Sequence, residues 1–164
     1  ADCLCFGNVM TLAQRAELAG LDFLGRVSGR YNYPRKFRQA AYADLFRRLG
    51  LPEMVLHVPN AYLVRGEYSE RIAERAAHYT AWLHDEARHV LTDPVWNDQV
   101  AFTLALAETL DPKRMGFFLP REVANLPAAR KLPARPTIIH YGTKRWWRLH
   151  HQGNLGVVIE EPTG

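Results

Sequence analysis

Three residue types suited to phosphate chemistry follow one another near the C-terminus, where residues 139–146 read IHYGTKRW. The neutral imidazole of His140 can bind a divalent metal. Gly142 lets the backbone approach a phosphate closely, and Lys144 supplies a positive point charge to it. Loops at strand ends are where α/β proteins bind ligands, so the segment indicates a metal-dependent phosphate site. The alternative is a strand-end histidine followed by a solvated lysine.

Asp98 and Gln99 open a predicted helix that starts at Asn97. If this helix end faces a pocket, the pair would contact a substrate. The alternative is structural, because a carboxylate in the first turn complements the helix dipole and contributes ~0.3–1 kcal/mol.

Other polar residues carry weaker signals when each is taken alone. Asn60 lies between two predicted strands, and Asn125 follows Leu119-Pro120. Asparagine is common in turns, so neither position is specific. His84 and His89 are five residues apart, whereas a helical zinc pair needs a spacing of four. We therefore expect a solvated helix end there rather than a hydrolase site.

The elements that must position these residues alternate between strands and helices. Extended segments are predicted at residues 2–6, 23–27, 54–58, 61–64, 114–119 and 137–141, and helices at 12–19, 34–49, 69–88 and from Asn97 onward. Pro59-Asn60 is expected to separate two strands, Ser69 to cap a helix and Gly50 to end one. Four prolines predict an irregular stretch from Pro120 to Pro136.

The helix from Asn97 has almost no polar face over residues 100–107, so it should be deeply buried. The alternation of elements predicts an α/β fold with a mixed sheet and flanking helices. No repeat or linker interrupts the sequence, which predicts a single domain over residues 1–164.

The composition indicates a folded protein with a mildly basic surface. Of 164 residues, 48% are hydrophobic and 23% charged, which excludes a disordered chain. The formal net charge of +4 fits an anionic partner but does not indicate nucleic acid. Cys3 and Cys5 are too few for a disulfide framework, which favours a reducing cytoplasm.

The order of the motifs resembles the second half of the GT-A glycosyltransferases. An Asp precedes an apolar strand, Asn60-Ala61 lies between strands, a Trp-Asn-Asp-Gln segment opens a helix, Leu-Pro precedes Asn125, and the HYGTK segment closes the series. Within that family, the sequence most resembles the retaining branch, which includes glycogenin and the bacterial lipopolysaccharide sugar transferases. The resemblance implies a partial GT-A fold, with the nucleotide-binding half expected upstream of Ala1 and this chain as the metal- and acceptor-side portion.

The resemblance also implies a role for each candidate residue. Asp2 matches the second aspartate of the metal-binding Asp-x-Asp motif, and His140 the further ligand of Mn²⁺ or Mg²⁺. The donor-binding positions correspond to Lys144, Gly142, Asn60 and Asn125, and the catalytic pair beside the donor sugar to Asp98 and Gln99. The implied reaction transfers a sugar from a nucleotide donor, expected to be a UDP-sugar, with retention, to a glycan, lipid-linked or protein acceptor. Peripheral membrane contact through residues 144–148 fits a lipid-linked acceptor.

A second hypothesis is a non-catalytic basic module. Arginines within residues 35–48 and the basic aromatic segment 144–148 would then hold an anionic polymer or a membrane surface. Binding of a polyanion would fall steeply with salt, because each neutralised charge releases a counterion.

The implied absence of the nucleotide-binding half leads to a first prediction. This chain by itself should neither bind UDP tightly nor turn over, because the uracil and ribose contacts would lie upstream. Release of UDP from a UDP-sugar measures this directly, and measurable hydrolysis by the purified chain would contradict it.

Overall fold

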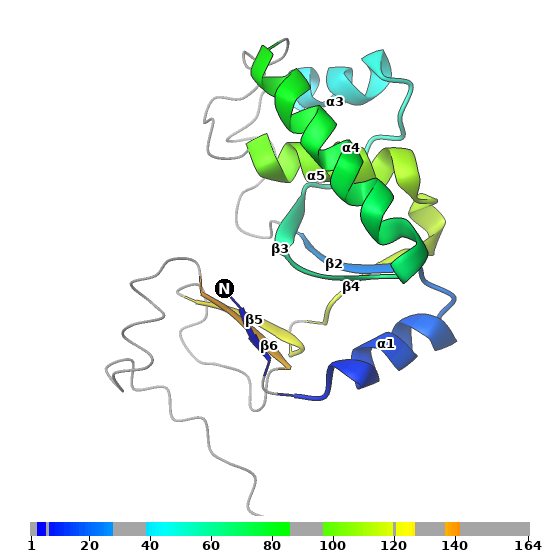
Figure 1. Ribbon diagram of the computed structural model, residues 1–164, viewed down its shortest axis with the longest axis vertical. Helices are drawn as coiled ribbons and strands as arrows, with labels where there is room; N and C mark the ends of the chain where they lie inside the picture. Colours follow the sequence, from blue (N-terminus) through cyan, green and yellow to red (C-terminus); the bar gives the residue numbers. More distant parts are fainter. Residues whose placement is uncertain are drawn as a thin grey trace, which may run out of the picture. The chain divides into compact units, whose positions relative to one another are not determined.

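Two compact units make up the chain. The computed structural model describes residues 3–5, 7–27, 39–85, 97–119, 121–126 and 137–141. One unit, here called the terminal unit, combines Ala1–Arg15 with Phe118–Gly164, and the central unit is Ala16–Phe117. Each contains a three-stranded sheet with parallel and antiparallel neighbours (Figure 1). The expected α/β class with mixed sheets is therefore confirmed.

The terminal unit is organised around its central strand β6. Its elements are β1 (Cys3–Cys5), the start of α1 (Val9–Leu18), β5 (Val123–Leu126) and β6 (Ile138–Tyr141). The strand order is β1-β6-β5, with β1 antiparallel and β5 parallel to β6. Ile139 on β6 is fully buried. The carboxylate of Glu122, just before β5, accepts hydrogen bonds of 2.7 Å from Arg15 and from the Leu119 N–H, which ties α1 to this sheet.

The central unit places β2 in the middle of its sheet. Its elements are β2 (Phe23–Val27), α3 (Gln39–Arg48), β3 (His57–Val64), α4 (Gly66–Asp85), α5 (Asn97–Thr109), a 3₁₀ turn (Pro112–Arg114) and β4 (Met115–Phe117). Strand β3 is antiparallel and β4 parallel to β2. The strands predicted at residues 2–6, 23–27 and 137–141 are confirmed, and the first helix starts at Val9, three residues earlier than predicted.

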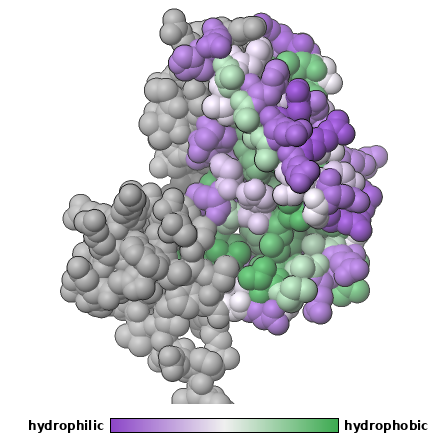
Figure 2. Space-filling model, viewed as in Figure 1, coloured by the Kyte–Doolittle hydropathy of each residue, from purple (hydrophilic) through white to green (hydrophobic). Residues whose placement is uncertain are grey.

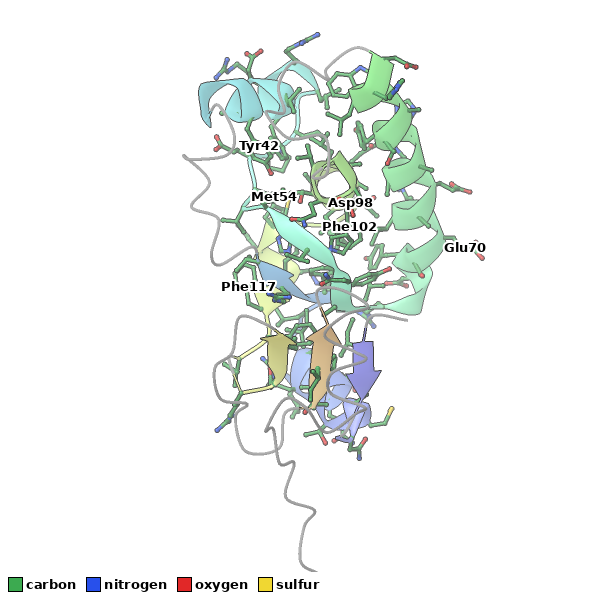
Figure 3. All side chains as sticks on the ribbon, turned by 90° about the vertical axis from the view of Figure 1, so that its left-hand side faces the viewer. Tyr42, Met54, Glu70, Asp98, Phe102 and Phe117 are labelled. Carbon is green, nitrogen blue, oxygen red and sulfur yellow. The ribbon has the colours of Figure 1, made fainter. Side chains whose placement is uncertain are left out.

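Helix α5 is the centre of the core, as its lack of a polar face predicted. Every residue from Val100 to Ala107 is buried. The helix packs between α4 and β3 (Figure 3). The outer face of α4 carries exposed charged residues, and Figure 2 shows this side of the unit as largely hydrophilic. Within the described part of the chain, no helix is both long and apolar enough to cross a membrane.

A polar network holds the C-terminal end of α5 against α4. Glu108 accepts hydrogen bonds from Arg75 at 2.6 Å and from the Tyr79 hydroxyl at 2.7 Å. Burial alone would raise the pKa of Glu108, but these two hydrogen bonds together with the positive charges of Arg75 and Arg71 lower the pKa below its usual value. The carboxylate therefore stays ionised and links the two helices at neutral pH.

Strand β3 corrects the prediction of two strands separated by Pro59-Asn60. It runs unbroken from His57 to Val64, and the irregularity is absorbed inside it. Val58 pairs with Arg26 and Tyr62 with Gly25, so residues 59–61 form a bulge with no counterpart on β2. Proline has no N–H to donate and is tolerated at such a bulge.

The predicted strand at residues 54–58 is wrong over its first part, because residues 54–56 lie outside the sheet. The carbonyl of Met54 accepts the Tyr42 hydroxyl at 3.2 Å instead, so this segment is tied to α3. Met54 and Leu56 are buried in the core by this route rather than by strand pairing.

Two further boundaries differ from the predictions. Ser69 does not cap α4, because the helix already starts at Gly66 and Ser69 lies inside its first turn. The acidic Glu67 in that turn complements the helix dipole. The stretch from Pro120 to Pro136 also contains a strand, β5, since its four residues fit between prolines and pair with β6.

The end of α3 follows the prediction at Gly50. Gly50 has a φ of +66°, a conformation that glycine adopts without strain. The Leu51 N–H then bonds back to the Phe46 carbonyl at 2.8 Å, which closes the last turn. The predicted start of this helix at Pro34 lies outside the described residues.

One buried carboxylate holds the three strands of the central sheet together at one end. Asp22, directly before β2, is 4% exposed and accepts hydrogen bonds from Arg114 at 2.7 Å and Arg65 at 3.1 Å. Arg114 directly precedes β4, and Arg65 directly follows β3. Backbone bonds between the Asp22 N–H and the Arg114 carbonyl, and the Arg65 N–H and the Asp22 carbonyl, reinforce the arrangement.

We predict that Asp22→Asn lowers the free energy of unfolding by about 1.5–3 kcal/mol, because hydrogen bonds to a charged group are lost at a buried position. Urea denaturation followed by circular dichroism measures this. The matched control is Asp44→Asn, which removes an exposed ion pair with Arg47 on α3 and should cost less than ~1 kcal/mol. Equal losses in the two variants would contradict the role assigned to Asp22.

Candidate functional site

The register of the terminal sheet brings two of the predicted site residues together. His140 lies on the central strand β6, paired with Asn125 of β5 on one side and with Cys3 of β1 on the other. Neighbouring strands lie about 4.8 Å apart. Residues separated by more than a hundred positions in the sequence therefore share one line across this sheet. Sequence order alone predicted each residue but not this pairing.

Three of the predicted site residues, Asp2, Gly142 and Lys144, lie outside the described residues. Asp2 directly precedes Cys3, the partner of His140, and Gly142 directly follows Tyr141, the last residue of β6.

The catalytic pair predicted at Asp98 and Gln99 lies in the first turn of α5, in the central unit. Asp98 is exposed, and its carboxylate accepts the Gln99 N–H at 2.8 Å. The side-chain oxygen of Gln99 is buried and accepts no hydrogen bond from the residues that the structure describes. A buried amide oxygen without a donor is costly unless a ligand or water supplies one. With respect to the described residues, this oxygen at the start of α5 is an acceptor without a donor.

Asn60 lies in the bulge of β3, also in the central unit. It is half-buried. A bulge redirects a side chain away from the regular alternation of the strand, and bulges are frequent beside binding sites. Strand β3 is the strand against which α5 packs (Figure 3).

A hydroxyl group that the sequence analysis did not single out joins α5 to β3. Thr103 is completely buried, and its hydroxyl donates to the Gln99 carbonyl at 2.8 Å. The same oxygen accepts the backbone N–H of His57, the first residue of β3, at 3.0 Å. The signal was present in the sequence, because Thr103 is the only polar residue from Val100 to Ala107.

His57 is a second buried polar residue that sequence reasoning missed. Its ring lies edge-on to Phe23 at 5.5 Å and stacks against Phe117 at 5.7 Å between ring centroids. Nδ1 forms no hydrogen bond within the described part of the chain. Burial lowers the pKa of His57 from 6.5 to about 4, so the ring is neutral at physiological pH.

Glycine is required beside this ring. A Cβ atom at Gly25 would come within 2.2 Å of the Phe23 ring and 3.1 Å of His57 Nδ1. The absence of a side chain on the central strand therefore makes room for both rings.

The histidine-rich end of α4 does not form a metal cluster in the part that is described. His84 Nδ1 lies 2.7 Å from Asp85, and both side chains are about three-quarters exposed. His89 lies outside the described residues. Among the residues whose positions are described, no group of three or more histidine, cysteine or acidic side chains could hold a metal ion.

Comparisons with known proteins found no relative of this chain. No protein-family model, curated protein or solved structure matches the chain.

The buried ring of His57 leads to a prediction of pH-dependent stability. Above pH 6.5 neither the folded nor the unfolded state protonates this residue. Between pH 6.5 and about 4 the unfolded chain binds a proton that the folded protein excludes, so the free energy of unfolding falls. The loss should reach about 3 kcal/mol.

Urea denaturation at a series of pH values measures this contribution as the difference between wild type and His57→Phe, which keeps an aromatic ring but cannot be protonated. The control His84→Phe changes an exposed histidine and should keep the wild-type pH dependence. A His57→Phe variant that loses stability as steeply as wild type would show that His57 is not the group responsible.

Proposed function

We propose that the chain is part of a GT-A-type glycosyltransferase that moves a sugar from a UDP-sugar donor to a glycan, lipid-linked or protein acceptor. The observation that carries the proposal is the register of the terminal sheet, in which His140 is paired with Asn125 and with the residue that follows Asp2. The pairing of His140 with Asn125 supports the proposal, because motif order assigned both residues to the same site. Retention at the transferred sugar rests on the family resemblance alone.

The two proposed ligand residues are compatible with the implied metal. Asp2 and His140 offer a carboxylate and an imidazole, ligand types that suit Mn²⁺ or Mg²⁺ together with the oxygens of a diphosphate. When bound, the metal would neutralise charge on the diphosphate leaving group.

The remaining residues have roles that follow from their chemistry. Lys144 would place a positive charge on the diphosphate, where charge develops as the glycosidic bond breaks. Gly142 would admit the phosphate close to the backbone. Asn125 and Asn60 would donate and accept hydrogen bonds with the donor, since an amide does both.

Asp98 and Gln99 would act at the donor sugar. The buried oxygen of Gln99 is suited to accept a sugar hydroxyl, and the exposed carboxylate of Asp98 can accept a second one. The two residues would orient the sugar for transfer, and correct positioning of a reactant lowers the barrier.

Manganese binding tests the proposal without requiring turnover. Free Mn²⁺ gives an electron paramagnetic resonance signal that is lost on binding, so a titration of the chain yields the affinity in the presence and absence of UDP. We expect UDP to strengthen Mn²⁺ binding. Asp2→Asn and His140→Ala should each weaken it at least ~10-fold, since even changes beyond the ligands themselves cost this much.

The matched control uses the same residue types elsewhere. His84→Ala combined with Asp85→Asn removes an exposed imidazole–carboxylate pair on α4 and should leave Mn²⁺ binding unchanged. Equal affinities in all variants would sink the proposed metal site. If, in addition, heparin binds with a steep salt dependence that Mn²⁺ does not alter, the basic binding module would replace the transferase as the favoured function.

A further inference from the structure

Thr103 occupies a position that links the proposed donor site to the sheet. Of the described residues that are buried and polar or charged, it is one of three, together with Asp22 and His57. A threonine hydroxyl often bonds back to the carbonyl four residues earlier in a helix, and the bond to Gln99 is of this kind. The hydrogen bond from the His57 N–H to Thr103 is different, because it comes from strand β3 and not from the same helix.

The two hydrogen bonds use the hydroxyl as a bridge with a defined direction. The O–H donates to Gln99, and a lone pair of the oxygen accepts from His57. Gln99 is thereby connected through one side chain to the start of β3. The bulge with Asn60 lies three residues further along the same strand.

We infer that Thr103 is a positioning residue for the donor sugar, and this inference rests on the proposed function. By joining the Gln99 carbonyl to His57, its hydroxyl sets where the first turn of α5 lies along β3, and so how the Gln99 side chain is placed relative to Asn60. Apolar contacts alone hold the rest of this part of α5, and such contacts are not directional. A hydrogen-bonded bridge supplies the direction that they lack.

Thr103→Val and Thr103→Ser separate the hydroxyl from the volume of the side chain. Valine has nearly the same shape but leaves the buried His57 N–H without its acceptor. Serine keeps the hydroxyl and loses a methyl group. The matched control is Thr109→Val on the same helix, because the buried hydroxyl of Thr109 forms no hydrogen bond within the described residues.

The first measurement is the position of the side-chain amide resonances of Gln99 and Asn60 in ¹⁵N-labelled protein, assigned with Gln99→Glu and Asn60→Asp. We expect both resonances to shift in Thr103→Val and to remain at their wild-type positions in Thr103→Ser and Thr109→Val. Unmoved resonances in Thr103→Val would overturn the positioning role. Should Thr103→Val fail to fold, hydrogen exchange of the His57 amide in the wild type decides: strong protection supports the bridge, and exchange at the rate of an open amide overturns it.

The second measurement follows the donor, with UDP-glucose and Mg²⁺ as the probe. Saturation-transfer difference NMR detects weak binding, and a titration followed through the glucose protons yields the affinity at the sugar end of the donor. We expect Thr103→Val to weaken this binding of UDP-glucose by a factor of about 5, the equivalent of one hydrogen bond. Thr103→Ser should keep the wild-type affinity for UDP-glucose.

The outcomes distinguish this inference from the proposed function. Transfer to UDP-glucose that is absent in every protein, with Gln99 displaced in Thr103→Val, would overturn the donor site and leave Thr103 a structural bridge. Transfer to the glucose protons in every protein, with the same affinity in all of them, would keep the donor site and overturn the positioning role of Thr103.

Discussion

The burial of α5 from Val100 to Ala107 is the constraint on which the rest of the central unit depends. A helix with no polar face over two turns must be covered on all sides, and the surrounding elements each supply part of that cover. Helix α4 contributes Ile72, Tyr79 and Leu83, α3 contributes Tyr42, Leu45 and Phe46, and β2 contributes Phe23. The segment before β3 leaves the sheet and joins this core through Met54 and Leu56. Residues 54–56 therefore do not form the predicted strand, because this segment helps to cover α5 instead.

Apolar contacts are not directional, and polar contacts at the middle and at the C-terminal end of α5 supply direction. Glu108 joins the C-terminal end to α4, and Thr103 joins the middle of the helix to β3. Asp22 does the same for the ends of the three strands. Buried polar groups are costly unless satisfied, so each one favours a single arrangement of the elements that it connects. The apolar residues of this core therefore supply most of its stability, and the few polar residues favour one arrangement of its helices and strands.

How far the sequence predicts this fold depends on whether a feature is local. Helix α5, strand β2 and the end of α3 at Gly50 follow from composition and turn chemistry, and all three were predicted. Strand β5 was missed because its pairing with β6, and not its own four residues, makes it a strand. The bulge at Pro59 was read as a break, since sequence patterns do not show whether a sheet can absorb extra residues. His57 was overlooked because its burial depends on Phe117 and on the missing side chain of Gly25.

The candidate site divides along the same line between local and long-range information. His140, Asn125, Gln99 and Asn60 were all named from motif order, but motif order could not say which of them lie together. The pairing of His140 with Asn125 comes from a parallel register between two short strands, and the bridge from Gln99 to β3 comes from one hydroxyl. In both cases hydrogen bonds between two elements determine where the candidate residue lies: the bonds between β5 and β6 for His140, and the Thr103 hydroxyl between α5 and β3 for Gln99. A polar site of this kind needs such direction, because apolar burial brings elements together without choosing their register.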